Sequence, residues 1–412
     1  MTTRYSMKSK VLAISLFVAT AGVIALYPIY QKGNAITGGT PPIQIDPAQV
    51  DPVKQSQAKK IELVFALDTT GSMGGLIHAA KEKIWSIATN MAQAEQSPEI
   101  RIGLVAFRDR GDEYVTKVID LSSDLDSVYA QLMDFSANGG GDGPESVNQA
   151  LHDAVHKISW SQDNDAFQVI FLVGDAPPHM DYQDDVKYPV SIQAAVDKGI
   201  LVNTIQCGND RSTLSKWQSM ASLGHGRFFN VAQDGNAVAM STPYDEELAT
   251  LSSAMDSTRL YYGSADERKQ KKRKMDATDK LNESASVESR ARRGMFNASA
   301  SGKKNQIGDG DLVEDISTGL TDLATVPTEN LPDAIKDMPV VEQQKLIEKT
   351  TQKRAELEAK MEATAKKRSD YIRKEMEERE STADSLDDQL VGALRAQAKK
   401  KGLDYTDESI TY

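Results

Sequence analysis

An apolar run that ends in an acidic, hydroxyl-rich turn constrains this chain more than any other feature of its sequence. Residues 63–67 have the length and residue types of a strand buried on both faces of a sheet. Asp68 follows directly, and residues 76–92 then have an amphipathic helical pattern. A buried strand followed by a helix is typical of an open parallel sheet, in which ligands bind at the carboxyl ends of the strands.

The turn after this strand offers oxygen atoms at alternate positions. Asp68, Thr70 and Ser72 can direct three oxygens toward one point, and Gly71 allows a tight turn between them. Hard cations such as Mg²⁺ prefer oxygen ligands. The same hydroxyls are also common as helix N-caps, so this turn alone leaves a metal site and a capping turn as alternatives.

Two further loops carry acidic residues near predicted elements of the same sheet. Residues 138–145 form a Gly-rich loop that contains Asp142 and Glu145. A second buried apolar run, 167–173, is followed by Asp175. Because the carboxyl ends of parallel strands meet at one edge, we expect all three loops to lie there together.

This set of loops resembles the von Willebrand factor type A domain and its metal-ion-dependent adhesion site. In that family, an Asp-x-Ser/Thr-x-Ser segment, a middle-loop residue and an Asp after a later strand surround one divalent ion. The resemblance implies that Asp68, Thr70, Ser72 and Asp175 fill the corresponding places here. It also implies Mg²⁺ as the cofactor, with Mn²⁺ or Ca²⁺ as alternatives.

The middle loop departs from the family's common pattern, which has a Thr at that position. The nearest match here is Asp142, which we take as the fifth metal ligand, and Glu145 is the alternative. A carboxylate at this position would neutralise more of the ion's charge. The ion would then be held more firmly and would attract an acidic partner group less strongly.

Strand and helix patterns alternate along residues 58–262, about the length of one domain. Strand patterns occupy 101–107, 114–119, 202–207 and 226–231, and helical patterns occupy 125–133, 146–158, 214–223 and 244–255. We therefore expect an α/β fold with a doubly wound, mostly parallel sheet and helices on both faces, as in Rossmann-like folds. A largely α-helical C-terminal extension should follow it.

Composition limits the classes of function. The chain has 412 residues, of which 40% are hydrophobic and 26% charged, enough for one sizeable core and a weaker second region. Its formal net charge of −12 argues against nonspecific nucleic-acid binding, so we expect no nucleic-acid partner. Cys207 is the single cysteine, and we expect it to be a buried structural thiol.

The beginning of the chain predicts export. Arg4, Lys8 and Lys10 precede an apolar run over 11–30, close to the ~20 residues that span a bilayer. Residues 33–35, Gly-Asn-Ala, offer the small-x-small pattern of a cleavage site, so a retained anchor and a cleaved signal peptide both stay open. Either places the rest of the chain across the membrane. We expect a protein that is anchored in the inner membrane and faces the periplasm, or one that is soluble in the periplasm.

We expect five segments along the chain. They are a signal peptide or membrane anchor (1–35), a Pro- and Gly-rich spacer (36–57), the type A domain (58–262), a charged, partly helical or disordered linker (263–330) and a helical tail (331–412). Within the linker, the basic run 268–274 is predicted to be a solvated helix face or a contact to the acidic domain.

The tail contains a segment, 341–379, that lacks Gly and Pro and predicts one long helix. We expect it to pack against another helix or the domain. Polar residues interrupt any strict heptad at Thr350, Lys353, Thr364 and Arg368, so a regular dimeric coiled coil is the alternative. This helix and the preceding Glu-Asn-Leu-Pro motif at 329–332 resemble the tails of bacterial exported proteins whose type A domain begins Asp-x-Thr-Gly-Ser-Met.

Three functions fit these observations. The first is a noncatalytic, metal-dependent protein-binding module of the bacterial cell envelope, in which an acidic side chain of an unidentified partner protein completes the metal shell. The second is a structural scaffold whose metal site is vacant or purely structural. The third is a Mg²⁺-dependent phosphohydrolase that resembles the haloacid dehalogenase type and uses Asp68, but Thr70 stands where that family has its second acid. We expect the first, and no enzyme.

Overall fold

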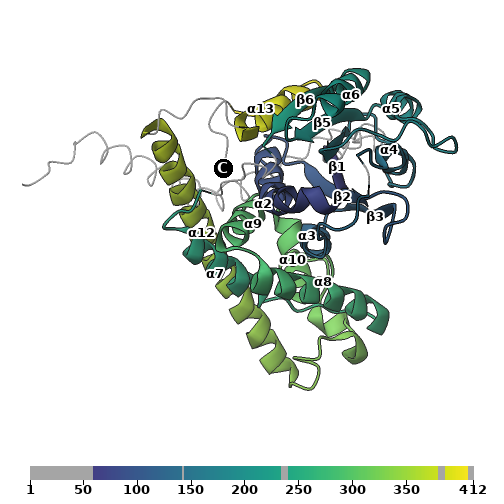
Figure 1. Ribbon diagram of the computed structural model, residues 1–412. Helices are drawn as coiled ribbons and strands as arrows, with labels where there is room; N and C mark the ends of the chain where they lie inside the picture. The colour runs from purple at the N-terminus through teal and green to yellow at the C-terminus, as the bar shows by residue number, and fades with distance from the viewer. Residues whose placement is uncertain (1–58, 142, 233–239, 379–385, 407–412) are drawn as a thin grey trace, which may run out of the picture. The chain divides into compact units, whose positions relative to one another are not determined.

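A six-stranded sheet organises the first half of the chain (Figure 1). The strand order is β3-β2-β1-β4-β5-β6, in which β3 is antiparallel to β2 and every other neighbouring pair is parallel. The strands are β1 (Lys60–Asp68), β2 (Glu99–Phe107), β3 (Thr116–Ser122), β4 (Phe167–Gly174), β5 (Leu201–Cys207) and β6 (His225–Val231). The predicted α/β fold with a mostly parallel sheet is confirmed.

The computed structural model describes residues 59–141, 143–232, 240–378 and 386–406. All of them belong to one unit, Gln57–Tyr412. The export segment expected over 1–35, the spacer expected over 36–57 and the candidate ligand Asp142 lie outside the described residues.

Helices cover both faces of the sheet, because successive side chains of each strand point to opposite sides. Ile61, Leu63 and Leu67 of β1 share a buried apolar core with α2 (Gly74–Met91) and α3 (Leu125–Met133). Val64 and Ala66 share a second core with three helices, α4 (Val147–His156), α5 (Tyr188–Asp197) and α6 (Arg211–Leu223). The central strand is therefore buried on both sides, as its apolar run predicted.

The remainder of the described chain is helical, which confirms the predicted C-terminal extension. Its helices are α7 (Asp245–Asp256), α8 (Ala265–Ser284), α9 (Val287–Ala298), α10 (Lys303–Ile307), α11 (Leu312–Ser317), α12 (Val340–Glu378) and α13 (Leu386–Lys399), with short 3₁₀ turns at Gly71–Met73, Leu323–Thr325 and Thr328–Asn330. The range expected as a linker, 263–330, thus contains α8 to α11. The boundaries expected at 262 and 330 stay predictions.

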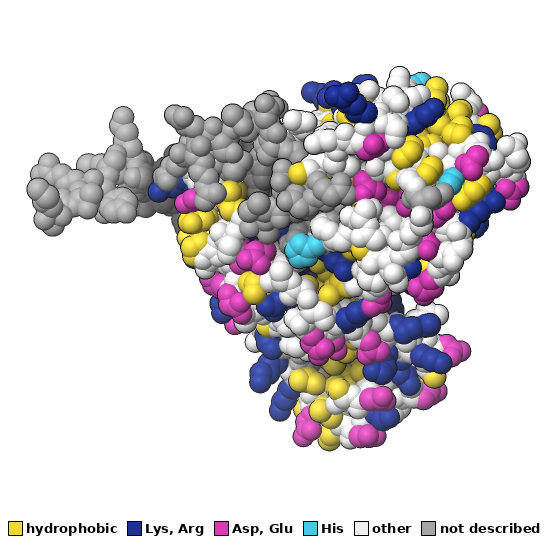
Figure 2. All heavy atoms as spheres, viewed as in Figure 1, with side chains coloured by type: hydrophobic (Ala, Val, Ile, Leu, Met, Phe, Trp, Pro, Cys, Tyr) yellow, Lys and Arg dark blue, Asp and Glu magenta, His cyan; other side chains and the backbone are white. Residues whose placement is uncertain are grey.

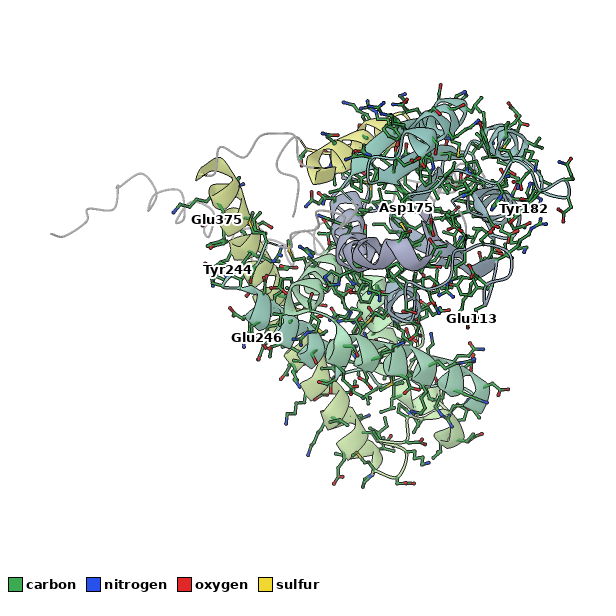
Figure 3. The ribbon with its side chains drawn as sticks, in the orientation of Figure 1. Glu113, Asp175, Tyr182, Tyr244, Glu246 and Glu375 are labelled. Carbon is green, nitrogen blue, oxygen red and sulfur yellow. The ribbon has the colours of Figure 1, made fainter. Side chains whose placement is uncertain are left out.

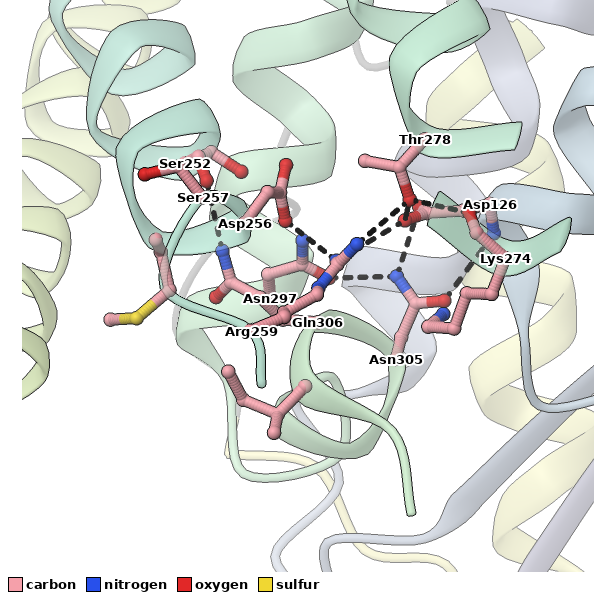
Figure 4. Close-up of polar contacts among 12 residues, drawn as sticks. Asp126, Ser252, Asp256, Ser257, Arg259, Lys274, Thr278, Asn297, Asn305 and Gln306 are labelled. Carbon is pink, nitrogen blue, oxygen red and sulfur yellow. Dashed lines mark hydrogen bonds and ion pairs between the residues drawn. The ribbon is translucent and has the colours of Figure 1, made fainter. Parts of the chain in front are cut away.

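A buried polar network joins α3 to this helical part (Figure 4). Asp126 on α3 accepts hydrogen bonds from Arg293 Nε at 2.7 Å and Arg293 Nη2 at 2.6 Å. Arg293 also donates to Asp256 of α7, at 2.8 and 2.9 Å. Both Arg293 and Asp126 are excluded from solvent, so the two halves of the unit meet through paired charges as well as apolar contacts.

The basic run on α8 takes part in the same contact. Lys274 is buried and its Nζ lies 2.6 Å from Asp124, at the start of α3. Lys280, six residues beyond the run, pairs with Asp134 at the other end of α3. Of the two predictions for residues 268–274, contact with the acidic domain therefore holds at Lys274.

The 39-residue helix α12 follows the predicted long helix to within one residue at each end and packs against α7 and α9. Leu357 and Met361 lie in an apolar cluster with residues of those helices. Arg354 donates to Asp311 at 2.8 and 2.9 Å, and Arg368 donates to Asp245 at 2.7 Å. Arg368, one of the residues that interrupt the heptad, is therefore part of a buried ion pair inside the unit.

The last helix, α13, returns to the sheet beside β6 and α2 (Figure 1). Leu390, Leu394 and Ala398 enter the same core as Ile61 of β1. The side-chain amides of Gln397 and Asn203 exchange hydrogen bonds of 3.0 and 3.1 Å. No helix in the described part of the chain combines the length and the hydropathy that crossing a membrane requires.

Candidate metal centre

Asp68 is the last residue of β1, and its carboxylate is held inside the protein. The side chain is only 1% exposed, between the ends of β2 and β4. Its Oδ1 accepts hydrogen bonds from the Thr70 backbone N–H at 2.9 Å and the Thr70 hydroxyl at 2.7 Å. Its Oδ2 is buried and accepts no hydrogen bond of normal geometry. The next hydroxyl along the turn, that of Ser72, lies 3.5 Å from Thr70 Oγ1.

The electrostatic surroundings of Asp68 disfavour its charged form. Burial raises its pKa to about 7, and the two hydrogen bonds from Thr70 offset only part of this effect. The negative charge of Asp175 raises the pKa further, while the nearby Asp175 backbone amide lowers it. A cation at this position would lower the pKa of Asp68 and favour its charged form.

The Gly-rich middle loop lies directly against the Asp68 turn. Gly71 N–H donates to the Gly139 carbonyl at 3.1 Å, and Asn138 N–H donates to the Thr69 carbonyl at 3.1 Å. Gly139 has a φ of +79°, and a Cβ there would lie 2.4 Å from the Asp112 carboxyl carbon. Glycine is therefore required at this position, because it adopts the positive φ without strain and leaves room for Asp112 of the neighbouring loop.

Glu145, at the end of the middle loop, contributes a second buried carboxyl. It is 4% exposed, and its Oε2 has no hydrogen-bond partner among the described residues. Burial first, and then the charges of Asp68, Asp109, Asp112 and Asp175, raise its pKa to about 9. The structure thus brings the alternative middle-loop residue into the site, and Asp142 lies outside the described residues.

Asp175 follows β4 and completes the expected edge. Its side chain is half-buried, and its backbone carbonyl accepts a hydrogen bond of 3.0 Å from the Thr213 hydroxyl on α6. Asp175 comes directly after an inner strand of the sheet, and Figure 3 shows Glu113 and Tyr182 farther toward the outside of the molecule. Asp68, Thr70 and Asp175 therefore lie at one edge, as the strand pattern predicted.

A fourth loop, between β2 and β3, is built into this edge and was not among the predicted site elements. Asp112 Oδ2 accepts from Gly140 N–H at 2.9 Å, and Asp109 Oδ1 accepts from the Ser146 hydroxyl at 2.8 Å. Arg108 Nε donates to the Thr69 carbonyl at 3.2 Å. Because β2 is parallel to β1, the acids that follow it at 109 and 112 could have been placed at this edge by the same rule.

The donors at this edge are a mixture of carboxylates and hydroxyls. In the described parts of the chain, no group of three or more His, Cys, Asp or Glu side chains is gathered in the manner of an all-side-chain metal site. Cys207 is buried, as predicted, and burial followed by the charges of Asp175 and Asp68 raises the pKa of its thiol well above the usual value. That thiol is therefore a poor nucleophile.

Comparisons with known proteins found matches to part of this chain. A family model described as the von Willebrand factor A domain matches residues 62–240. The human von Willebrand factor A domain-containing protein 7 is 37% identical over 116 residues, which are 28% of this chain and 12% of that protein. The match to the family model supports a von Willebrand factor A domain in this part of the chain, as the resemblance implied.

Two solved structures of low overall similarity were also found. The SpRpn10 VWA domain has 14% identity and a TM-score of 0.33 over 45% of this chain and 95% of its own. The mussel byssus proximal thread matrix protein 1 with a zinc occupied MIDAS motif has 16% identity and a TM-score of 0.34 over 43% of each chain. TM-scores of this size carry no conclusion about function.

Proposed function

We propose that this protein is a noncatalytic, divalent-cation-dependent protein-binding module of the bacterial cell envelope. One observation carries the proposal: Asp68 Oδ2 is buried without a hydrogen bond of normal geometry, at an edge where Glu145 also buries an unpartnered oxygen. Buried carboxylates need a compensating partner, and carboxyl and hydroxyl oxygens are the ligands that a hard cation prefers. Mg²⁺ is the cation we expect, with Mn²⁺ or Ca²⁺ as alternatives.

The residues that would hold the cation come from three loops. Asp68, Thr70 and Ser72 would be the ligands from the loop after β1, and Asp175 the ligand from the loop after β4. Glu145 fits the position of the ligand from the Gly-rich middle loop, and Asp142 stays a prediction for the same position. When bound, the cation would offset the repulsion between these carboxyls and present a position that an acidic side chain of a partner protein can fill.

The surroundings of Asp68 favour binding over chemistry. Thr70 occupies the position where a haloacid dehalogenase would have its second acid, and it donates two hydrogen bonds to Asp68 Oδ1. A threonine at this position cannot act as the general acid that such an enzyme has there. A structural scaffold whose metal site is vacant or purely structural is the first alternative, and it differs in the absence of a partner at the site.

The location at the envelope is proposed from the sequence. The cations and apolar run at the beginning of the chain are the support for export, with an inner-membrane anchor or a soluble periplasmic form as the two outcomes. The resemblance of the tail to those of bacterial exported proteins points the same way.

Calorimetry on the purified full chain tests the metal dependence. We expect saturable Mg²⁺ binding in isothermal titration and a higher unfolding temperature with Mg²⁺ than with chelator, since a ligand that binds only the folded state stabilises it. Asp68→Ala should abolish both effects. Asp333→Ala is the matched control, because that carboxylate is 78% exposed on the helical part and should leave both effects intact.

A partner experiment separates the binding module from the scaffold. Proteins retained from envelope extract by the wild-type chain in Mg²⁺ should be released by chelator and should not be retained by Asp68→Ala. If proteins are retained equally in chelator and by Asp68→Ala, the structural scaffold would be the better description. Phosphate release from an aryl phosphate that disappears in Asp68→Asn would instead establish the phosphohydrolase.

A further inference from the structure

The segment from the end of β4 to the first turn of α5 exposes apolar side chains beside the candidate metal centre. Met180 is 42% exposed, Val186 41% and Val190 62%. We call residues 176–190 the β4–α5 surface. Figure 2 shows hydrophobic side chains gathered on the exterior near α5 and α6. Exposed apolar patches often mark protein contact sites.

This segment is ordered by contacts of its own. The Tyr182 ring stacks on His179, with ring centroids 4.0 Å apart. The guanidinium of Arg110, a residue of the β2–β3 loop, lies 4.1 Å from the centroid of the Tyr182 ring. Tyr182 Oη donates to Asp109 at 3.0 Å. A contact segment that is already fixed in the free protein loses little conformational entropy on binding.

The β4–α5 surface is also hydrogen-bonded to Glu145, at the end of the Gly-rich middle loop of the metal centre. Glu145 N–H donates to the Pro177 carbonyl at 2.9 Å, and His179 N–H donates to the Glu145 carbonyl at 3.1 Å. Asp175 lies immediately before the surface in sequence. A partner group that reaches the cation would therefore have this surface as its neighbour.

Charge at the rim restricts the partner further. The side chains of Asp181 and Asp184 are each 72% exposed, and that of Glu113 is 79% exposed. Arg110 is 38% exposed and already pairs with Asp184 at 2.9 Å. Among these four side chains the carboxylates outnumber the one guanidinium, so a partner segment that carried only acids would be repelled from them.

We propose that the β4–α5 surface selects the partner, and that it accepts a protein segment whose metal-binding carboxylate is flanked by aliphatic side chains and by a lysine or arginine. The aliphatic groups pack on Met180, Val186 and Val190. The basic group faces Asp181 and Asp184. This inference rests on the proposed function, because the carboxylate needs the cation.

A displayed library of random 12-residue peptides provides a probe that requires no known partner. Peptides are selected on the immobilised full chain in MgCl₂ and eluted with chelator. We expect the selected sequences to combine an Asp or Glu with aliphatic and basic residues. Their affinity, measured by fluorescence anisotropy on synthetic peptides, should fall when the basic residue is replaced by Ala and when salt is raised.

A matched pair of variants tests the surface itself. Val190→Asp should weaken peptide binding about tenfold or more, a loss common for an anchoring contact. Val341→Asp should leave it within about twofold, because Val341 is 60% exposed on α12 and outside the surface. Isothermal titration with MgCl₂ should give the wild-type result for both variants.

The outcomes distinguish this inference from the proposed function. Magnesium-dependent peptides that bind Val190→Asp as tightly as wild type, peptides without basic residues, or no selected peptide at all would overturn the inference while Mg²⁺ binding stands. Absence of Mg²⁺ binding to the wild-type chain would overturn the proposed function, and the inference would fall with it.

Discussion

Replacing Arg293 by Met should remove a shared hydrogen-bond donor and positive charge from two buried carboxylates at the junction between α3 and the helical part. Arg293 makes five hydrogen bonds there, two to Asp126, two to Asp256 and one to Ser252. Met has similar length and fills much of the same space, so the loss is mainly one of charge and hydrogen bonding.

The expected loss follows from what would still contact the carboxylates. Removing one partner of a buried ion pair typically costs about 3–5 kcal/mol. Asp126 would keep hydrogen bonds from Thr278 at 2.9 Å and Asn305 at 3.2 Å, and Asp256 would keep Arg259 at 2.6 Å. These contacts place the expected destabilisation near the lower end, at about 3 kcal/mol.

The pH dependence of the loss has a definite sign. Burial by itself would raise the pKa of Asp126, but the charge and hydrogen bonds of Arg293, with Lys274 and Arg259 nearby, hold that pKa well below its usual range. A depressed carboxyl pKa adds stability that is present above the unfolded pKa of about 3.9 and is lost as pH falls toward the folded value. Arg293→Met raises the folded pKa, so the difference between wild type and variant should shrink between pH 7 and pH 3.

Urea unfolding followed by circular dichroism measures the free energy of unfolding at each pH. Arg273→Met is the matched control, because Arg273 is exposed on α8 and its loss should change stability by less than about 0.5 kcal/mol. A loss below about 1 kcal/mol for Arg293→Met, or one that grows as pH falls, would refute this account of the junction.

Three further changes have defined expectations. Burial and neighbouring acids raise the pKa of Glu145 to about 9, so stability in chelator should fall between about pH 4.5 and 9, and Glu145→Gln should remove most of this slope and add roughly 1 kcal/mol at pH 7 in thermal unfolding. Arg354→Leu leaves Asp311 buried without its cation and should cost about 3 kcal/mol, with hydrogen exchange in α12 accelerating first; unchanged exchange there would contradict the assignment. Gln397→Ala should cost about 1–2 kcal/mol because it removes the amide partner of Asn203, and limited proteolysis should then cut α13 faster than in wild type.

The sheet and the position of its edge were predictable because they depend on local pattern. Residues 63–67 and 167–173 are apolar without interruption, and each is followed by an acid at the carboxyl end of its strand. The structure places Asp68 and Asp175 together for that reason. Metal binding by them stays a proposal.

The middle-loop position was harder to predict because a Gly-rich loop has no periodic pattern. Asp142 and Glu145 both follow the glycines, and sequence spacing favoured Asp142. The burial of Glu145 depends on its backbone hydrogen bonds with Pro177 and His179, which lie more than thirty residues away in sequence. Only the folded chain shows that contact.

The packing of the C-terminal helices could not be predicted for a related reason. Dense charge in a sequence normally indicates a solvated face. Here Lys274 is buried beside Asp124, which is 150 residues away, and Arg368 is buried beside Asp245, which is 123 residues away. A local pattern contains no information about such a distant partner.

The return of α13 to the sheet has a consequence for the order in which the chain folds. The core that contains Ile61 of β1 also contains Leu394 and Leu403, so it cannot close until residue 403 has been synthesised. Contacts of such long sequence separation form slowly, and the apolar surface that α13 covers beside β6 and α2 stays exposed until they do. Deleting residues from 386 onward should therefore produce a chain that collects in inclusion bodies rather than a shorter version of the folded protein.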